Sequence, residues 1–451
     1  MLANLEAVTS SIVQLVWGLP LVLALCLSGV FFTFYFGFPQ LRFFVHAIQI
    51  VSGKHSKADK ESEGEISHFQ ALCTALSATV GLGNIAGVAI AVSLGGPGAV
   101  FWLWVAGFLG MATKFTEVTL SLLYREVGSS GQVHGGPMYT IKNGLSKKFL
   151  PVAWIYSLFV ILSSFGAGNM FQSNQMAQIL LTSLSVPTWV SGFVFCCFAY
   201  LVLVGGIQRI GKVTEKLVPF MVGIYFLGAM GIILSNWTNI DEIFYSIFNG
   251  AFNGTAAVGG FAGVAIKEVV VMGIRRASFS NEAGMGSAAM AHSAAKSAPA
   301  QEGIVALLEP FIDTIVVCSI TALALLSTGA WTQAGIEGSE VTAWAFESVY
   351  GGWGRAIVTL TITLFAFSTI ISWSYYGEQG VTFIFGEKYI KAYRLVFIVF
   401  IFLGSIAQLS IVLNVSDAVY GLLAIPNLFC TYMLVKKAKI ALNDYRQQMN
   451  F

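Results

Sequence analysis

The sequence predicts an all-α membrane protein with eleven transmembrane helices, and three observations support this fold class. Of the 451 residues, 56% are hydrophobic and only 10% are charged, whereas about 25% of residues are charged in an ordinary soluble domain. The apolar residues gather in runs long enough to cross a hydrocarbon core of about 30 Å, which takes about 20 helical residues. These runs also lack the strict alternation that is typical of membrane β-barrel strands.

Eleven apolar runs divide the chain. They lie at 12–37, 66–93, 98–124, 150–182, 187–205, 214–235, 243–272, 301–328, 353–384, 391–412 and 417–436. No Lys or Arg precedes the first run, and a secretory signal would need a basic segment there. We therefore expect the first run to stay in the protein as a spanning helix.

The basic residues predict the orientation in a cell membrane. Alternate connections hold 21 of the 24 Lys and Arg, at 38–65, 125–150, 205–216, 273–300, 385–394 and 436–451. The other connections hold none, at 1–11, 94–97, 183–186, 236–242, 331–352 and 413–416. Because basic loops resist translocation, the N-terminus is expected outside and the C-terminus in the cytoplasm.

The ten helices after the first form two halves, 66–235 and 236–438, between the first helix and its loop (1–65) and a cytoplasmic tail (439–451). Each half begins with a glycine-rich interruption, at 78–87 and 254–263. Backbone that is not helical at membrane depth persists only where it lines a cavity or a ligand site. Five is an odd number, so the halves have opposite orientations. An inverted repeat with a discontinuous first helix in each half is typical of secondary transporters. Alternatively, the glycines only permit close helix packing.

Composition and motifs exclude several other functions. The net charge of +2 is too small for binding to nucleic acid by counterion release. The six cysteines form no CxxC pair and are interpreted as packing residues. The sequence has no Walker loop, no HExxH and no GxSxG motif, so neither ATP-driven transport nor an enzyme activity is predicted.

Residues 95–110, GGPGAVFWLWVAGFLG, resemble the signature of the alanine or glycine:cation symporter family, also called sodium:alanine symporters. The segments TVGLGN (79–84), HGGPMY (134–139) and SNEAGMGS (280–287) extend the resemblance over nearly the whole chain. Leu103 stands where the signature usually has Met, which is a conservative exchange. The resemblance implies a fold like that of the bacterial leucine transporter, and symport of sodium with L-alanine or glycine, and in some members D-alanine. It implies no organic cofactor.

An amino acid at the membrane midplane needs donors for its carboxylate and acceptors for its ammonium, and helix ends supply both without buried charge. The first interruption offers the candidate substrate residues Thr79, Gly81, Leu82, Gly83 and Asn84. In the fourth run, Phe165, Gly168 and Gln172 share a face at helical spacing. We expect Gln172 to bind the substrate, Phe165 and Phe171 to close over it, and Thr369 and Trp373 to form the opposite wall. Alternatively, the amides only join helices to one another.

Sodium is a hard cation and should prefer oxygen ligands. Ser368 and Thr369 offer hydroxyls, and the carbonyl of Phe365 completes this side of the site. By resemblance to the broken helix of the leucine transporter, the carbonyls of Ser77 and Val80 face the same ion. The resemblance also suggests a second sodium site, formed by Thr79, Asn84 and Thr255. The alternative is that the hydroxyls only bond to carbonyls of the preceding helical turn.

Ionisable residues inside spans are functional candidates by default. Lys114 and Glu117, at i and i+3, are expected to pair with each other. Glu309 and Asp313 share a face at i and i+4. Asp313 is expected either to sense an ion or proton, or to pair with a Lys of another helix.

Two further charged residues, Arg276 and Glu282, are expected to form an inner gate on the cytoplasmic side.

The sequence thus favours a sodium-coupled symporter that works by alternating access. One alternative is a carrier coupled to protons, with Asp313 or Glu309 as the titrating group. A second alternative is a membrane sensor or channel that binds amino acids. A channel usually shows filter residues repeated across subunits, which a single chain with an internal repeat does not favour.

Overall fold

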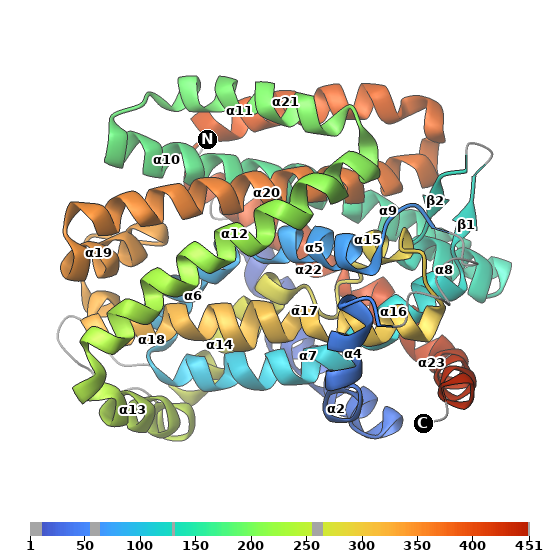
Figure 1. The fold of residues 1–451 in the computed structure, drawn as a ribbon, viewed down its shortest axis with the longest axis horizontal. Helices are drawn as coiled ribbons and strands as arrows, with labels where there is room; N and C mark the ends of the chain where they lie inside the picture. Colours follow the sequence, from blue (N-terminus) through green and yellow to red (C-terminus); the bar gives the residue numbers. More distant parts are fainter. Residues whose placement is uncertain (1–10, 55–63, 129–130, 255–264, 450–451) are drawn as a thin grey trace.

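The computed structural model describes residues 11–54, 64–128, 131–254 and 265–449, with only the backbone described at 409–415. Within these residues the fold is helical, as predicted, apart from one short antiparallel hairpin of β1 (Glu126–Val127) and β2 (Val133–His134). Figure 1 shows the helices stacked in layers that run across the molecule.

The elements up to Ser235 correspond to the first helix and the first half. They are α2 (Leu19–Phe36), α3 (Pro39–Arg42), α4 (Phe44–Val51), α5 (His68–Thr79), η2 (Gly83–Gly87), α6 (Val88–Gly95), α7 (Gly98–Leu123), α8 (Pro137–Gly144), η3 (Lys147–Phe149), α9 (Leu150–Phe165), η4 (Gly166–Met170), α10 (Phe171–Leu184), α11 (Thr188–Leu203) and α12 (Gly206–Ser235).

The remaining elements form the second half and the tail. They are η5 (Trp237–Asn239), α13 (Ile240–Asn253), α14 (Ile266–Asn281), α15 (Ala289–Ser293), α16 (Pro299–Ala306), α17 (Leu308–Pro310), η6 (Phe311–Cys318), α18 (Ser319–Thr328), η7 (Ala330–Thr332), α19 (Ser339–Tyr350), α20 (Gly352–Phe385), η8 (Glu387–Tyr389), α21 (Ile390–Ile406), α22 (Leu409–Leu422) and α23 (Ala424–Gln448).

Within the described residues, eight helices are long and apolar enough to cross a membrane. A ninth span is the pair His68–Thr79 and Gly83–Gly95, which is bent by 50° at the predicted first interruption. Thr188–Leu203 is apolar but shorter. The chain is therefore a multi-pass membrane protein, and the count of eleven spans stays a prediction.

The start of the second half is described on both sides of the predicted interruption. Within the run at 243–272, α13 ends at Asn253 and α14 begins at Ile266. The interruption predicted at 254–263 lies, except for Gly254, outside the described residues. A break within the described residues comes later, where Glu282, Gly284 and Gly286 have positive φ angles of 59°, 92° and 76°. The helix resumes only at α15. Glu282 is the left-handed residue that ends α14, and Gly284 and Gly286 supply the left-handed backbone that follows it.

The last two runs also differ from the prediction in their bounds. The run at 391–412 ends as α21 at Ile406, where Ala407 and Gln408 have extended backbone. The outer connection predicted at 413–416 lies inside α22. The sequence continues with long apolar runs on both sides of this boundary, so hydropathy does not mark it.

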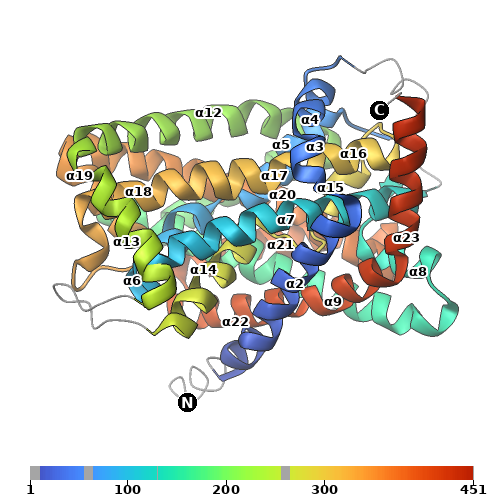
Figure 2. The same cartoon turned by 90° about the horizontal axis from the view of Figure 1, so that it is seen from below.

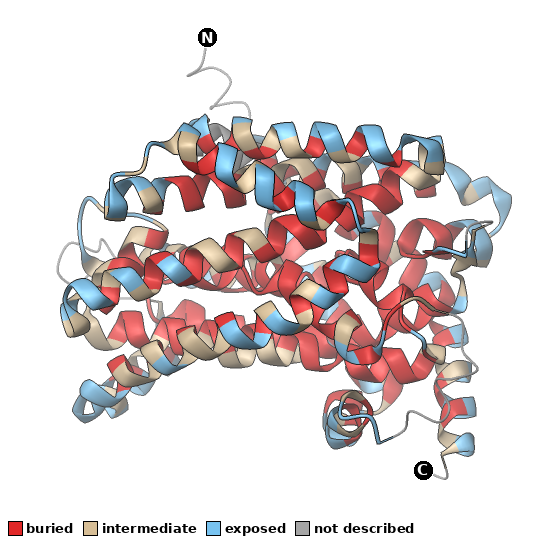
Figure 3. Ribbon diagram, turned by 45° about the horizontal axis from the view of Figure 1, so that its top comes forward, coloured by how far each residue is buried: buried red, intermediate tan, exposed pale blue. Residues whose placement is uncertain are grey.

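The long helix α7 runs through the middle of the molecule (Figure 2), packed against α2, α14 and α16. Glycines allow these contacts to be close. A Cβ atom on Gly98 would meet the backbone of Gly250, and one on Gly273 would meet the carbonyl of Ala99. Figure 3 shows buried residues along the inward faces of the helices and exposed ones on the outward faces. Large apolar side chains such as Leu227 are exposed there, as expected of a surface that faces lipid.

A buried ion pair joins α7 to α17. The Nζ of Lys114 lies 3.1 Å from Oε1 of Glu309, and both side chains are fully buried. The predicted pairing of Lys114 with Glu117 is therefore wrong. Glu117 instead accepts hydrogen bonds from the N–H of Gly284 and the amide of Asn427, because helix packing places these donors within its reach.

Removing one partner of this pair should destabilise the fold. We expect Lys114→Met to cost about 3–5 kcal/mol of stability, because it leaves the carboxylate of Glu309 buried without its cation. Adding Glu309→Gln should restore a large part of that loss. Thermal unfolding of the purified protein in detergent measures both effects. Equal stability of the single and double variants would contradict this account.

Candidate functional site

The break in the first helix is held open by Asn84. The α-helix α5 ends at Thr79 and the π-helix η2 begins at Gly83. The Oδ1 of Asn84 accepts a hydrogen bond from the N–H of Gly81 at 2.8 Å. Its Nδ2 donates to Oδ1 of Asp313 at 2.7 Å and to the carbonyl of Asp313 at 3.0 Å. One amide thus satisfies an N–H freed by the break and ties the break to η6.

Oxygen atoms of α5 and α20 gather beside the break. The hydroxyls of Thr369 and Ser368 lie 3.0 and 3.4 Å from the carbonyl oxygen of Ser77. Ser368 also donates to the carbonyl of Phe365 at 2.9 Å. Ser77 donates through its own hydroxyl to the carbonyl of Ser368 at 2.6 Å. These residues are fully or almost fully buried, so the cluster supplies the oxygen ligands that a hard cation needs.

The structure separates the two interpretations of these hydroxyls. The bond from Ser368 to Phe365 is the bond to the preceding turn that the alternative describes. Thr369 donates across to another helix instead. Val80, which follows the cluster at the end of α5, is fully buried.

Three residues from three elements meet at the break. A Cβ atom on Gly81 would lie 2.5 Å from Oγ1 of Thr369 and 3.6 Å from Oε1 of Gln172. The Nε2 of Gln172 donates to the carbonyl of Ala167 at 3.0 Å, whereas its buried Oε1 has no hydrogen-bond partner among the described residues. An unpaired buried acceptor is costly, so this oxygen is suited to a ligand with a donor group.

Trp373 forms one wall of this region. Its ring lies against Gly168, where any side chain would overlap it. The indole Nε1 donates to Oε1 of Glu282 at 3.0 Å, so the wall is anchored to the break after α14. The ring centroid of Trp373 lies 5.9 Å from that of Tyr420, and Tyr420 lies 5.0 Å from Phe279. Phe171 meets Phe279 at 6.1 Å, which continues the aromatic wall.

Other predicted site residues lie elsewhere. The ring of Phe165 packs against Tyr393, Phe397 and Phe400. The predicted face of residues 165, 168 and 172 assumed regular helical spacing, and the π-helix η4 breaks that spacing.

The second sodium site was predicted from Thr79, Asn84 and Thr255, and the structure describes only the first two. The hydroxyl of Thr79 bonds to the carbonyls of Ala75 and Leu76 within α5. Thr255 lies outside the described residues. Of the remaining break residues, Leu82 is buried and Gly83 lies close to Ser280 of α14.

The structure also corrects the expected partners of two charged residues. Asp313 accepts from Asn84, Ser280 and Thr314, all neutral donors, so the suggested pairing with a Lys is not present. Arg276, like Arg275, lies within α14 and faces Asp417 of α22. Glu282 bonds instead to Trp373 and Ser287. Arg276 and Glu282 therefore do not form a gate with each other in this conformation.

Sequence reasoning missed the contribution of Phe279, Ser280 and Tyr420. The available sequence signal was the family-like segment SNEAGMGS, which contains Ser280, whereas the predicted interruption of the second half lies at 254–263. Ser280 reaches Asp313 at 3.1 Å, so the two breaks share one partner in η6.

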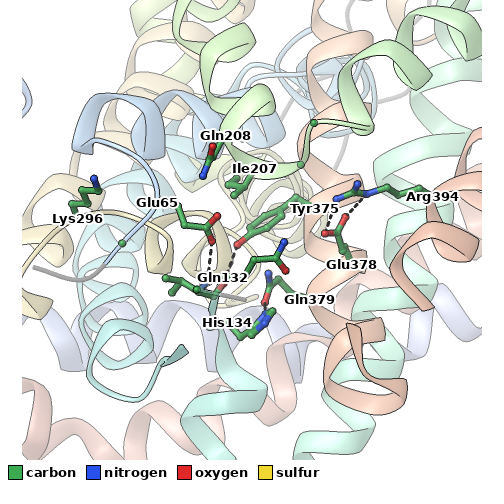
Figure 4. Close-up of a pocket in the computed structure, with 15 residues that line it drawn as sticks. Glu65, Gln132, His134, Ile207, Gln208, Lys296, Tyr375, Glu378, Gln379 and Arg394 are labelled. Carbon is green, nitrogen blue, oxygen red and sulfur yellow. Dashed lines mark hydrogen bonds and ion pairs between the residues drawn. The ribbon is translucent and has the colours of Figure 1, made fainter. Parts of the chain in front are cut away.

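A polar cavity of about 450 Å³ lies farther along α20. Figure 4 shows Tyr375, Glu378 and Gln379 of α20 lining it together with Glu65 and Arg394. Arg394 donates to both oxygens of Glu378, at 2.8 and 2.9 Å. Burial raises the pKa of Glu65, although the hydrogen bond from the N–H of Val133 and the charge interaction with His134 act to lower it. The α20 residues that line the cavity, Tyr375, Glu378 and Gln379, follow Trp373 on the same helix.

Comparisons with known proteins agree with these features. The model of the sodium:alanine symporter family matches residues 2–450. The chain is similar to the sodium/alanine symporter AgcS of Methanococcus maripaludis, with 42% identity over 95% of this chain and 94% of AgcS. It is also similar to the probable sodium/glutamine symporter GlnT of Bacillus subtilis, with 33% identity over 98% of this chain and 91% of GlnT.

Among solved structures, the fold is similar to that of MhsT in complex with L-phenylalanine. The TM-score is 0.60 and the identity 12%, over 84% of this chain and 93% of MhsT. At this identity the likeness concerns the fold alone.

Proposed function

We propose, because this chain belongs to the sodium:alanine symporter family, that it carries a small neutral amino acid, alanine or glycine, together with sodium. The chain is a membrane transporter rather than an enzyme. The observation that carries the finer proposal is the meeting of Ser77, Thr369, Gly81 and Gln172 at one break. An oxygen cluster for a cation and an unpaired acceptor for an ammonium lie there side by side.

The sodium site we propose consists of the carbonyls of Ser77, Val80 and Phe365 and the hydroxyls of Ser368 and Thr369. These are neutral oxygen groups, so the bound ion brings the only charge. Because Thr79 and Asn84 are bonded elsewhere, their contacts favour a single sodium over the second site formed with Thr255.

The amino acid we propose lies between the break and Trp373. Its carboxylate faces the N-terminal end of η2 and α6, where the helix dipole favours a negative charge. Its ammonium donates to Oε1 of Gln172. Its small side chain faces Trp373 and Gly168, with Phe171 in the wall behind. D-alanine fits the same groups if its methyl is accommodated on this side.

Coupling follows from the shared break. Sodium and the amino acid each stabilise the same geometry of residues 77–84, so each raises the affinity for the other by an equal factor. We propose that α5/α6 and α14/α15 are the corresponding broken helices of two inverted repeats. Access then alternates as these elements move against the rest of the molecule.

The proton-coupled alternative has one observation in its favour, the buried carboxyl of Asp313 with neutral donors only. A pH gradient that drives uptake without sodium would support it. A sensor or channel would show no counterflow.

Uptake into proteoliposomes tests the main proposal. We expect saturable accumulation of labelled L-alanine under an inward sodium gradient, and none with equimolar potassium at fixed pH and membrane potential. Equal uptake in both salts would contradict sodium coupling.

Thr369→Ala should raise the sodium concentration for half-maximal uptake about tenfold or more, since it removes a ligand and disturbs the shared break. Asn84→Ala should lower the affinity for both sodium and the amino acid.

The matched control for Thr369→Ala is Thr361→Ala. Thr361 lies on the same helix, is fully buried, and bonds only to the carbonyls of Ile357 and Val358. Its loss should leave the sodium dependence unchanged, so an equal effect of both variants would remove Thr369 from the site.

Gly168→Ala should narrow substrate selection. Its methyl would displace the ring of Trp373, and one methylene in a tight pocket is worth about tenfold or more in selectivity. We expect uptake of alanine to fall about tenfold relative to glycine, measured as the ratio of kcat/KM. Gly223→Ala is the control, because nothing lies near that position in α12. An unchanged ratio in Gly168→Ala would place the substrate elsewhere.

The orientation, with the N-terminus outside and the C-terminus cytoplasmic, remains a proposal that labelling can test. In a background without native cysteines, an impermeant thiol reagent should modify Gln333→Cys in intact cells. Lys391→Cys should react only in inside-out vesicles. Both positions are exposed. The reverse pattern would invert the topology.

A further inference from the structure

Five ionisable side chains form a continuous buried chain outside the proposed binding site. The Nδ1 of His68 lies 2.5 Å from Oε2 of Glu302, and Oε1 of Glu302 lies 2.7 Å from Nδ1 of His292. The Nε2 of His292 lies 3.4 Å from Oε2 of Glu309, whose other oxygen pairs with Lys114. We call His68, Glu302, His292, Glu309 and Lys114 the inner polar chain.

The inner polar chain joins the first residues of α5 to α15, which follows the break after α14. His68 begins α5, His292 lies in α15, and Glu302 of α16 bonds to both. Figure 1 shows α5 and α15 side by side. The backbone is joined here as well, because the N–H groups of Glu65 and Ile66 donate to the carbonyl of Ala294, and that of Lys296 donates to Ile66.

Arg125, which follows α7, holds the end of α15 and the residues just after it from another side. Its Nη1 donates to the carbonyls of Ser293 and Ala295 at 2.8 Å each. The structure therefore shows a conformation in which these two ends are held together. Alternating access requires them to separate at some stage.

Counting charges shows that the inner polar chain needs a proton. Lys114 balances only one of the two carboxylates, Glu302 or Glu309. Burying an unbalanced charge costs several kcal/mol, so the chain is neutral only when it binds one proton. Glu117 and Glu282 also lie near Lys114, and their negative charge makes this requirement stronger.

Geometry allows that proton to rest on either side of Glu302. Both histidines turn Nδ1 toward its carboxylate. On His292 the proton would also pair Nε2 with Glu309. His292 is fully buried, whereas His68 is 7% exposed and lies at the end of α5. Exchange with solution therefore takes place through His68, on one side of the membrane.

Among the described residues, four other titratable groups interact with members of the inner polar chain: Glu117 and Glu282 with Lys114, and Asp313 and Tyr376 with Glu309. Further charged or titratable groups lie on the elements around it, namely Cys73 of α5, Arg125 after α7, Lys296 after α15, His46 of α4 with Tyr445 of α23, Tyr156 of α9 and Glu215 of α12. Glu117, Glu215 and Glu282 have hydrogen-bond donors of their own. None of these groups lies between the two histidines.

We propose that Glu302, with His68 and His292, is a binding site for one proton, and that the bound proton favours the conformation in which the inner ends of α5 and α15 are joined. The proton enters and leaves through His68 and is not carried across the membrane. Acid conditions favour the joined conformation, and loss of the proton on raising the pH favours separation. Only the assignment of this side to the cytoplasm rests on the proposed orientation.

The distance between the two ends tests the proposal without sodium or amino acid. Spin labels at Phe69→Cys and Lys296→Cys, in a background without native cysteines, report it by double electron–electron resonance in the purified full-length protein. From about pH 6 to about pH 10, a range that extends above that of a free histidine because Glu302 and Glu309 flank His292, we expect the ratio of long to short distances to rise about tenfold.

Glu302→Gln should remove this pH dependence, because Lys114 then balances Glu309 and no proton is required. Glu387→Gln is the matched control. Glu387 pairs with His134 at 3.1 Å on the same side of the protein but is partly exposed and outside the inner polar chain. That variant should keep the full pH response.

If Glu302→Gln does not fold, His68→Gln serves instead, because it leaves Glu302 and His292 in contact. It should lower the pH midpoint by about one unit, since one of the imidazoles sharing the proton is lost. A distance ratio independent of pH in the unmodified protein, or a response kept in Glu302→Gln, would overturn the proposal. An unmoved midpoint in His68→Gln would do the same. Failure of alanine uptake would leave this result unaffected, so the two proposals fail separately.

Discussion

The structure depends on one constraint, that backbone polar groups released by a broken helix inside a membrane must find partners within the protein. Asn84 meets this constraint at the first break by accepting from Gly81 and donating to Asp313. At the second break, Asn281 accepts from the N–H of Ala283, and Glu117 accepts from that of Gly284. Both breaks are therefore held by side chains, and the geometry they preserve is the one that positions the proposed ligands.

The same constraint explains why so many polar residues are buried around α7 and η6. Asp313 accepts hydrogen bonds from Asn84 at the first break and from Ser280 at the second. Lys114 of α7 meets Glu309, and Glu117 of α7 meets the second break. The two breaks are thus connected through η6 and α7, and the proposed coupling of the two ligands has this connection to act on.

The proposed binding site and the inner polar chain lie at different positions along the broken helices. The oxygen cluster and Gln172 lie where α5 stops, and they are neutral groups suited to ligands that bring their own charge. The inner polar chain lies at the opposite end of α5 and is ionic. Neutral groups can release a ligand without leaving buried charge behind. An ionic contact holds its helices together until water solvates the charges or a proton neutralises one of them.

The sequence by itself determined the helical class, most of the spans and the first break, because hydropathy and glycine content are local properties. It also marked Gln172, Ser368 and Thr369 as polar residues inside apolar spans, and the family resemblance added Ser77. Only the tertiary structure showed the break after α14, because that break depends on the left-handed backbone of Glu282, Gly284 and Gly286 and on the contacts of this segment with η6 and α7. It likewise decided that Lys114 pairs with Glu309 and that Phe165 turns toward α21. These outcomes depend on contacts between distant segments and on a π-helix, neither of which a helical period can show.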